Sequence, residues 1–266
     1  MPFLGAFTAK RLFFIIEWNG DENANMKKND EKKINAFDLR EKVYKANLRL
    51  QRDGLSILTW GNVSGIDRER GVILIKPSGV PYETMRPEDI VTLNLEGEAI
   101  EGDRKPSSDT PTHVALYKAF PNIGAIVHTH SPYAVAFAQA KRDIPPYGTT
   151  HADAFFGPIP CSRDLTKEEI EGDYEANTGK LIVETFRNRD YEAIPGALIA
   201  SHGAFVWGKN PEEALDRALI LEEVAKMAVL SERLNPNIKP ISKALLDKHY
   251  NRKHGKKAYY GQPKKQ

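Results

Sequence analysis

Residues 125–137, AIVHTHSPYAVAF, join a short apolar run to a Ser-Pro step and carry two histidines between them. The apolar run is typical of a buried strand, and Ser131 followed by Pro132 is typical of a helix start. We therefore predict a strand that leads into a helix at this point. His128 and His130 are two residues apart, and alternate side chains of a strand point to the same face. Taken alone, this pair either binds a metal or forms local hydrogen bonds.

The chain before this segment predicts one helix, several strands and a second helix. Apolar residues recur at helical spacing from Leu39 to Leu50, and Gly54 ends the pattern. Thr110 and Pro111 are expected to form the cap and first turn of a helix that ends before Pro121. Between these helices, three segments bounded by turn residues are interpreted as strands: LSILTWGNVSGID, GVILIKPSGV and DIVTLNLEGEAIEGD, residues 55–67, 71–80 and 89–103.

The chain after the segment continues the mixture of helices and strands. Thr166 and Glu169 have the spacing of a capping box and predict a helical region. Residues 196–208, GALIASHGAFVWG, are interpreted as two strands, and a long helix is expected to begin at Asn210. No internal repeat or low-complexity linker is apparent. The pattern predicts one α/β domain over residues 35–262.

Composition supports a single globular domain inside the cell. The chain has 266 residues, of which 41% are hydrophobic, and its only cysteine is Cys161, so an intramolecular disulfide and a thiolate-rich zinc site are both excluded. A reducing, cytoplasmic location is expected. No apolar stretch is long enough to cross a membrane. Residues 1–34 are expected to be a poorly specified extension and residues 263–266 a basic tail.

The charge balance gives no general reason to expect a nucleic-acid partner. The formal net charge is +2, from 38 basic and 36 acidic residues that are interspersed along most of the chain. The exception is the end, KHYNRKHGKKAYYGQPKKQ, which is strongly basic. This end is either a solvated tail or a site for an anionic ligand.

A third histidine and two Ser-rich turns suggest a catalytic site. His202 ends an apolar strand and is followed by Gly203, as expected for a ligand that needs a close approach of the backbone. Three neutral histidines leave an open coordination position, which is the pattern of catalytic zinc. The turns KPSG, residues 76–79, and PSSDTP, residues 106–111, supply hydroxyl and backbone donors for a phosphate, or serve as ordinary turns and caps.

Several motifs together resemble the L-ribulose-5-phosphate 4-epimerases of the class II sugar-phosphate aldolase and epimerase superfamily. The resemblance covers residues 35–262 in order, with few gaps, and leaves only the first 34 residues outside it. The motifs are TWGNVSG, IKPSGV, KPSSDTPTHVALYKAFPNIGAIVHTHSPYA, HADAFFGPIPCSR, ALIASHGAFVWGK and KHYNRKHGKKAYYGQ.

The resemblance implies a three-layer α/β/α fold with a central, mostly antiparallel mixed sheet. It implies a homotetramer with active sites between subunits. It also implies a Zn2+ ion, or another divalent metal such as Mn2+ or Co2+, held by His128, His130 and His202. Asp109 matches an acidic position near the metal, where related aldolases carry Glu.

The resemblance also implies roles for the substrate-binding and proton-transfer residues. Asp153 and Tyr260 match the acid/base pair, with Tyr260 reaching in from a neighbouring subunit, although Tyr259 beside it leaves a one-position slip open. His249 matches an accessory catalytic position and Arg252 an accessory substrate-binding position at the interface. The positions that match the phosphate-binding set are Asn62, Lys76, Ser78, Gly79, Ser107 and Ser108.

The implied reaction interconverts L-ribulose 5-phosphate and D-xylulose 5-phosphate in pentose catabolism of the L-arabinose type. Direct proton removal at C4 would give an unstabilised carbanion, because C4 is not adjacent to the carbonyl, whereas metal-assisted cleavage and re-formation of the C3–C4 bond avoids it. A class II aldolase acting on L-fuculose or L-rhamnulose phosphate is the alternative. A zinc hydrolase and a non-catalytic binding module of the same fold are further alternatives, disfavoured by the acid/base pair and by the three histidines.

Overall fold

The computed structural model describes residues 38–261 of the chain. The predicted extension over residues 1–34 and the predicted tail over residues 263–266 lie outside the described residues. Within the described part, a seven-stranded sheet has the order β4-β3-β2-β1-β5-β7-β6, and every pair of neighbouring strands is antiparallel. The strands are β1 Asn62–Asp67, β2 Val72–Ile75, β3 Val91–Asn94, β4 Ala99–Glu101, β5 Ala125–Thr129, β6 Gly196–Leu198 and β7 Ala204–Gly208.

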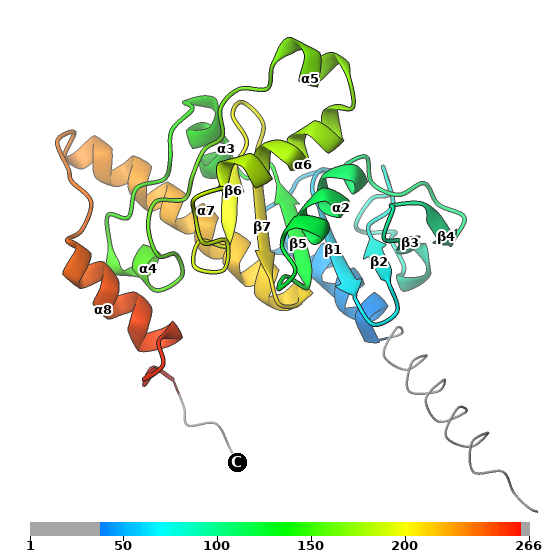
Figure 1. Ribbon diagram of the computed structural model, residues 1–266, viewed down its shortest axis with the longest axis horizontal. Coiled ribbons are helices and arrows are strands. Elements are labelled where there is room, and N and C mark those ends of the chain that lie inside the picture. Colours follow the sequence, from blue (N-terminus) through cyan, green and yellow to red (C-terminus); the bar gives the residue numbers. More distant parts are fainter. Residues whose placement is uncertain (1–37, 262–266) are drawn as a thin grey trace, which may run out of the picture. The chain divides into compact units, whose positions relative to one another are not determined.

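Helices cover both faces of this sheet, so the described domain has three layers. The long helix α7 packs against β5 and β7 on one face, beside a helix over residues 38–52, and α2 and α6 pack together on the other (Figure 1). The helices are α2 Thr110–Ala119, α3 Pro132–Gln139, α4 Thr149–Ala152, α5 Lys167–Glu171, α6 Tyr174–Thr185, α7 Pro211–Leu234 and α8 Lys243–His254, with a short 3-10 turn at Pro87–Asp89. The predicted α/β class and antiparallel sheet are confirmed.

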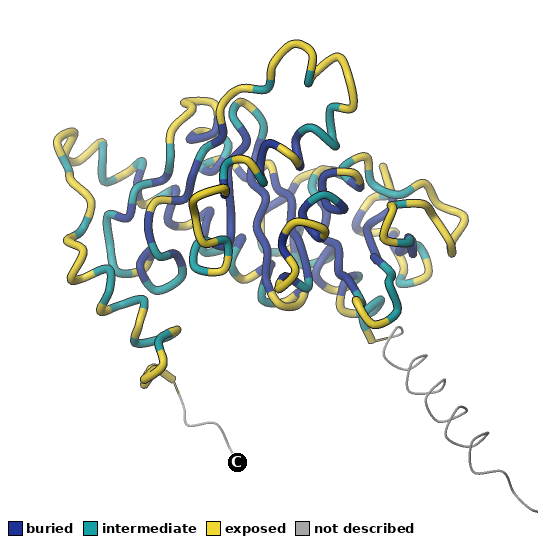
Figure 2. Tube along the Cα trace, in the orientation of Figure 1, coloured by how far each residue is buried: buried dark blue, intermediate teal, exposed yellow. Residues whose placement is uncertain are grey.

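The two faces of the sheet carry two separate hydrophobic clusters, because both sets of alternating side chains are buried. Val63 and Val127 belong to the cluster under α7, whereas Ile126 and Trp207 belong to the cluster under α2 and α6. Figure 2 shows the central strands buried along most of their length, whereas the edge strand β4 is exposed and α8 has no buried residue. The sheet is therefore a rigid base, and its strand ends are the places where polar side chains can gather.

Most predicted elements are present, but several boundaries differ. Within residues 55–67 the strand begins only at Asn62, and residues 89–103 hold two strands, β3 and β4, rather than one. The start of α2 differs as well. The cap of this helix is Asp109 rather than Thr110, which is the first helical residue. The capping box of Thr166 and Glu169 is present and opens α5. Asn210 caps α7 by accepting a hydrogen bond from the backbone N–H of Glu213 at 2.9 Å. No helix among the described residues combines the length and apolar character needed to span a membrane.

Two histidines outside the predicted metal set are buried inside the domain. His113 is hydrogen-bonded at Nδ1 to the Ser64 hydroxyl at 2.7 Å, and His151 donates from Nε2 to the carbonyl of Gly157 at 2.6 Å. Burial lowers the pKa of His113 to about 3 and that of His151 to about 4. Both are therefore neutral structural residues in the folded protein.

These two histidines predict a loss of stability in acid. Their pKa values in the folded state lie below the value near 6.5 of the unfolded chain. Below pH 6.5 the unfolded chain therefore binds more protons than the folded protein, and the folded state loses stability. With a chelator present, the free energy of unfolding in urea is expected to fall between pH 6.5 and 4, each buried histidine contributing about 1.4 kcal/mol per pH unit. His151→Gln should reduce this slope, and His254→Gln, at an exposed histidine, should not. Equal slopes in wild type and His151→Gln would contradict the assignment.

Candidate metal centre and active site

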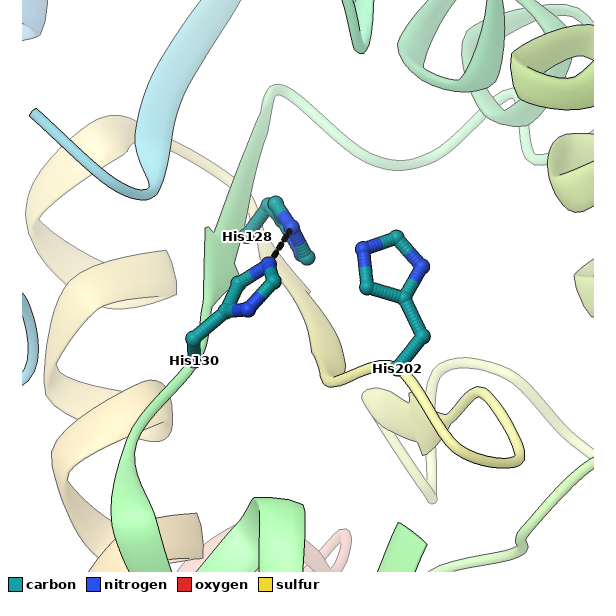
Figure 3. A group of neighbouring side chains, drawn as sticks. All are labelled: His128, His130 and His202. Carbon is teal, nitrogen blue, oxygen red and sulfur yellow. Dashed lines mark hydrogen bonds between the residues drawn. The ribbon is translucent and has the colours of Figure 1, made fainter. Parts of the chain in front are cut away.

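Three histidines from two parts of the chain meet at one end of the sheet. His128 lies in β5, His130 directly follows this strand, and His202 lies in the turn between β6 and β7. One nitrogen from each imidazole lies within 4.8 Å of the others. Figure 3 shows a ring nitrogen of His202 facing the other two rings while its second nitrogen faces away. The prediction that these three side chains come together is confirmed.

Hydrogen bonding and burial leave these imidazoles in the form that binds metals. Nδ1 of His128 donates to the carbonyl of Ala204 at 3.0 Å, so Nε2 carries the lone pair, and this atom lies 2.9 Å from Nε2 of His130. Burial, aided by the neighbouring histidines, lowers the pKa of His202 to about 4 and also lowers that of His130. A three-nitrogen set of this kind fits a divalent ion such as zinc and leaves positions open for a further ligand.

Two glycines allow the backbone segments of this centre to approach closely. A Cβ at Gly203 would lie 2.5 Å from the carbonyl oxygen of Thr129. Any residue other than glycine at position 203 would therefore keep the turn that carries His202 from lying this close to β5. Gly61 has φ +71°, and a Cβ there would lie 2.8 Å from the carbonyl oxygen of His128. The expected need for a glycine after His202 is confirmed.

A buried carboxylate fixes the chain direction after His130. Glu222 of α7 accepts hydrogen bonds from the backbone N–H groups of Tyr133 and Ala134, both at 2.9 Å, in the first turn of α3. The positive end of the α3 dipole also stabilises this carboxylate. Ser131, the residue before α3, makes no side-chain capping hydrogen bond. The turn between β5 and α3 is therefore held by α7, which packs against α3.

Asp109 lies beside the histidines and is held in place by a neighbour. Its carboxylate oxygen is 4.0 Å from Nε2 of His128 and accepts a hydrogen bond from the Asn62 side chain at 2.6 Å. Burial alone would raise the pKa of Asp109, but the neighbouring His128 and the Asn62 hydrogen bond lower it below its usual value. The carboxylate therefore stays ionised next to the three histidines.

A pocket of about 540 Å³ connects the three histidines to the residues predicted to bind phosphate. Gly79 has φ +68°, and a Cβ added there would meet no heavy atom within 4 Å, so the backbone at this position faces open space. The polar lining of the pocket combines serine hydroxyl groups with the three imidazoles. All six predicted phosphate-binding residues line it: Asn62, Lys76, Ser78, Gly79, Ser107 and Ser108.

Lys76 lies in this pocket, but its amine points toward backbone carbonyls. Nζ donates to the carbonyl of Val80 at 3.0 Å, with longer contacts to those of Pro77 at 3.4 Å and Thr59 at 3.5 Å. The ammonium also lies 4.7 Å from the ring centre of Tyr82. Burial lowers the pKa of Lys76 to about 8. In this conformation the lysine holds the two loops of the pocket together, and its predicted contact with phosphate stays a prediction.

The predicted acid/base residues form a second cluster at α4 and α8, and none of them lines the pocket of the same chain. Asp153 accepts two hydrogen bonds from Arg252, at 3.1 and 2.6 Å, and one from His249 at 3.1 Å. The guanidinium of Arg252 lies 4.9 Å from the ring centre of Tyr260. Burial would raise the pKa of Asp153, but the hydrogen bonds from Arg252 and His249 lower it. The structure therefore brings these four residues together, away from the histidines.

Comparison with known proteins places this architecture in a family. Residues 41–229, more than half of the chain, match the model of the class II aldolase and adducin N-terminal domain. The chain belongs to this family. It is similar to an L-fuculose 1-phosphate aldolase, with 25% sequence identity, 81% of this chain and 95% of that chain covered, and a TM-score of 0.69.

Two further solved structures share the fold. The L-fuculose-1-phosphate aldolase of Thermus thermophilus is 27% identical, with 74% of this chain and 95% of that chain covered and a TM-score of 0.59. The protein YgbL of Klebsiella pneumoniae is 24% identical, with 79% and 97% covered and a TM-score of 0.65. The three-layer arrangement around an antiparallel sheet is thus the class II aldolase fold.

Sequence reasoning named no role for six residues of the pocket. Four of them lie inside motifs that it quoted, Thr59, Trp60, Gly61 and Pro77, whereas Tyr174 and Glu175 lie outside every such motif. Tyr174 and Glu175 open α6, in a region predicted only as helical after Thr166. The helical region is instead interrupted between Glu171 and Tyr174, and the interruption turns the start of α6 toward the histidines. Gly172 was the one available signal, because glycine is common where helices end.

The close approach at Gly203 predicts that Gly203→Ala disrupts the metal centre. The added methyl group overlaps the carbonyl of Thr129, so the turn carrying His202 must shift. We expect binding of Zn2+, measured by competition with a chromophoric chelator, to weaken by about 10-fold or more. Gly148→Ala is the matched control, because a Cβ there has no heavy atom within 4 Å. Unchanged affinity in Gly203→Ala would show that this contact does not position the histidine.

Proposed function

We propose that this protein is a metal-dependent, cytoplasmic sugar-phosphate 4-epimerase that interconverts L-ribulose 5-phosphate and D-xylulose 5-phosphate. The observation that carries the proposal is the division of polar residues between two places. The pocket joins three histidines to a set of hydroxyl and amide donors, and in the separate cluster at α4 and α8 Asp153 and Tyr260 both contact Arg252. The pocket suits a substrate that has both a phosphate and two neighbouring oxygen atoms. The cluster at α4 and α8 offers two groups that can exchange protons with such a substrate.

The pocket side chains would bind and orient the substrate. Ser78, Ser107 and Ser108 of the pocket offer hydroxyl donors for the phosphate. His128, His130 and His202 would hold a divalent ion, which supplies Lewis acidity to the oxygens on C2 and C3 of the substrate when it is bound. Anchoring by the phosphate keeps the two-carbon fragment in place, so its aldehyde can turn over between cleavage and re-formation of the C3–C4 bond.

Two charged groups of the pocket are already engaged, so we assign proton transfer at the C4 oxygen to groups outside it. Asp109 already accepts a hydrogen bond from Asn62, and the amine of Lys76 donates to backbone carbonyls. Asp153 and Tyr260 are proposed to take this role from a neighbouring subunit of a homotetramer. One of them accepts the C4 hydroxyl proton as the bond breaks, and the other returns a proton on the opposite face after the aldehyde has turned.

The second candidate function is an aldolase of the same family that releases its two fragments. The similarity to L-fuculose 1-phosphate aldolases favours it. Asp109 in place of Glu, together with the Asp153 and Tyr260 cluster, favours the epimerase. Product analysis separates the two reactions, since only an aldolase liberates free aldehyde.

We predict that the metal-loaded enzyme converts L-ribulose 5-phosphate to D-xylulose 5-phosphate without releasing glycolaldehyde phosphate. Activity should be lost with a chelator and restored by Zn2+, Mn2+ or Co2+. Tyr260→Phe should lower kcat by about 100-fold or more, because a proton-transfer group is removed, and Tyr259→Phe should not. Free glycolaldehyde phosphate as the main product would favour the aldolase, and turnover of neither kind would reject the proposed substrate.

A mixing experiment tests whether the active site is shared between subunits. The double variant His128→Ala, His130→Ala lacks the metal set, and the double variant Asp153→Asn, Tyr260→Phe lacks the acid/base pair, so each alone should be inactive. After the two are unfolded and refolded together in equal amounts, about a quarter of the sites should combine an intact pocket with an intact pair. Activity should return to about that fraction of wild type. No recovery in mixed oligomers would contradict a shared site.

A further inference from the structure

Tyr174 lies in the pocket with the three histidines, and the predicted reaction gives it no role. Its hydroxyl oxygen is 3.3 Å from Nδ1 of His202. The two rings are 6.2 Å apart between centres and inclined by 34°, so they do not stack face to face. The contact between them is therefore made through the hydroxyl group.

The start of α6 holds Tyr174 firmly. Thr178 donates a hydrogen bond from its hydroxyl to the Tyr174 carbonyl at 2.9 Å, and Thr112 of α2 donates to the carbonyl of Glu175 at 2.6 Å. A Cβ at Gly179 would lie 2.6 Å from the Ala115 side chain, so α6 and α2 pack very closely at this level. The phenol is thus presented from a rigid pair of helices.

His202, in contrast, lies in a turn that needs external support. The preceding residue, Ser201, has φ +63°, which is strained for a residue other than glycine. The backbone of the turn is fixed by the hydrogen bonds from His202 N–H to Ile199 and from Ser201 N–H to Ala138, both at 2.9 Å. These contacts fix the main chain but not the rotation of the imidazole.

The direction of the Tyr174 hydrogen bond follows from the chemistry of a ligating imidazole. The nitrogen of His202 that faces the other histidines must carry a lone pair to bind a cation, so Nδ1 on the far side must carry the proton (Figure 3). Nδ1–H then donates to the oxygen of Tyr174. The hydroxyl proton of Tyr174 is left free to donate to another acceptor in the pocket.

We propose that Tyr174 is a positioning residue of the metal centre, whose hydroxyl oxygen accepts a hydrogen bond from Nδ1–H of His202 and so sets its tautomer and ring orientation. His128 has the backbone carbonyl of Ala204 for the same purpose. The support of His202, in contrast, comes from a side chain, and a substitution at Tyr174 can remove it. The proposal rests on the metal-binding part of the proposed function and is independent of the sugar.

Zinc affinity of the full-length protein tests this proposal without any substrate. Tyr174→Phe keeps the ring and removes only the acceptor, and we expect Zn2+ to bind about 10- to 100-fold more weakly. Tyr147→Phe is the matched control, because it removes a phenol oxygen that bonds to Glu232 instead. Thermal unfolding of each metal-free variant identifies any loss of folding. Equal zinc affinity in wild type and folded Tyr174→Phe would overturn the proposal.

A double-mutant cycle tests whether Tyr174 acts through His202. In a His202→Ala background, Tyr174→Phe should have no further effect on zinc affinity, because the bonded partner is already absent. The same loss in both backgrounds would overturn the proposed route. The visible spectrum of bound Co2+ should also change in Tyr174→Phe but not in Tyr147→Phe. If wild type itself binds no zinc, both this proposal and the metal-dependent function fail, whereas failure with the sugar alone leaves this proposal standing.

Discussion

The candidate site depends on the register of β5 against β7. Pairing of Thr129 with Ala204 brings the residues just beyond this pair together, so His130 lies beside the turn that carries His202. A slip of one residue would turn every side chain of β5 to the other face and remove His128 from the group. Both strands lie inside the sheet, and hydrophobic clusters on both faces hold them in this register. Packing of the core therefore sets the geometry of the polar site.

The polar centre is supported from three different layers of the domain. The Ala204 carbonyl in the sheet orients His128, Glu222 on α7 fixes the first turn of α3 after His130, and Tyr174 on α6 contacts His202. Burial favours the neutral imidazoles that a metal requires, while the ionised carboxylate of Asp109 is stabilised within the same small volume. Buried polar groups are stable in such an arrangement only where each has a hydrogen-bond partner. At the open side of the pocket, a bound substrate would supply the partners that the protein does not.

The sequence was sufficient for the elements whose signals are local. The Ser-Pro and Asn-Pro steps marked the starts of α3 and α7, and the two strands around His202 and Gly203 were predicted because a strand period and a glycine break are both short-range features. The interruption before Tyr174 and the direction of the Lys76 amine were not predictable in this way. Both depend on tertiary packing, namely of α6 on α2 and of the loop at Val80 on the loop at Thr59. The separation of Asp153 and Tyr260 from the pocket likewise depends on where α8 packs, which no local pattern indicates.

The central claim is that His128, His130 and His202 bind one divalent ion through imidazole nitrogens. X-ray absorption at the zinc edge, recorded on protein loaded with one equivalent of Zn2+, tests it most directly. We predict a spectrum fitted by three imidazole nitrogens at about 2.0–2.1 Å with remaining positions filled by oxygen. A spectrum fitted by oxygen ligands alone, or one that is unchanged in His202→Ala, would contradict it.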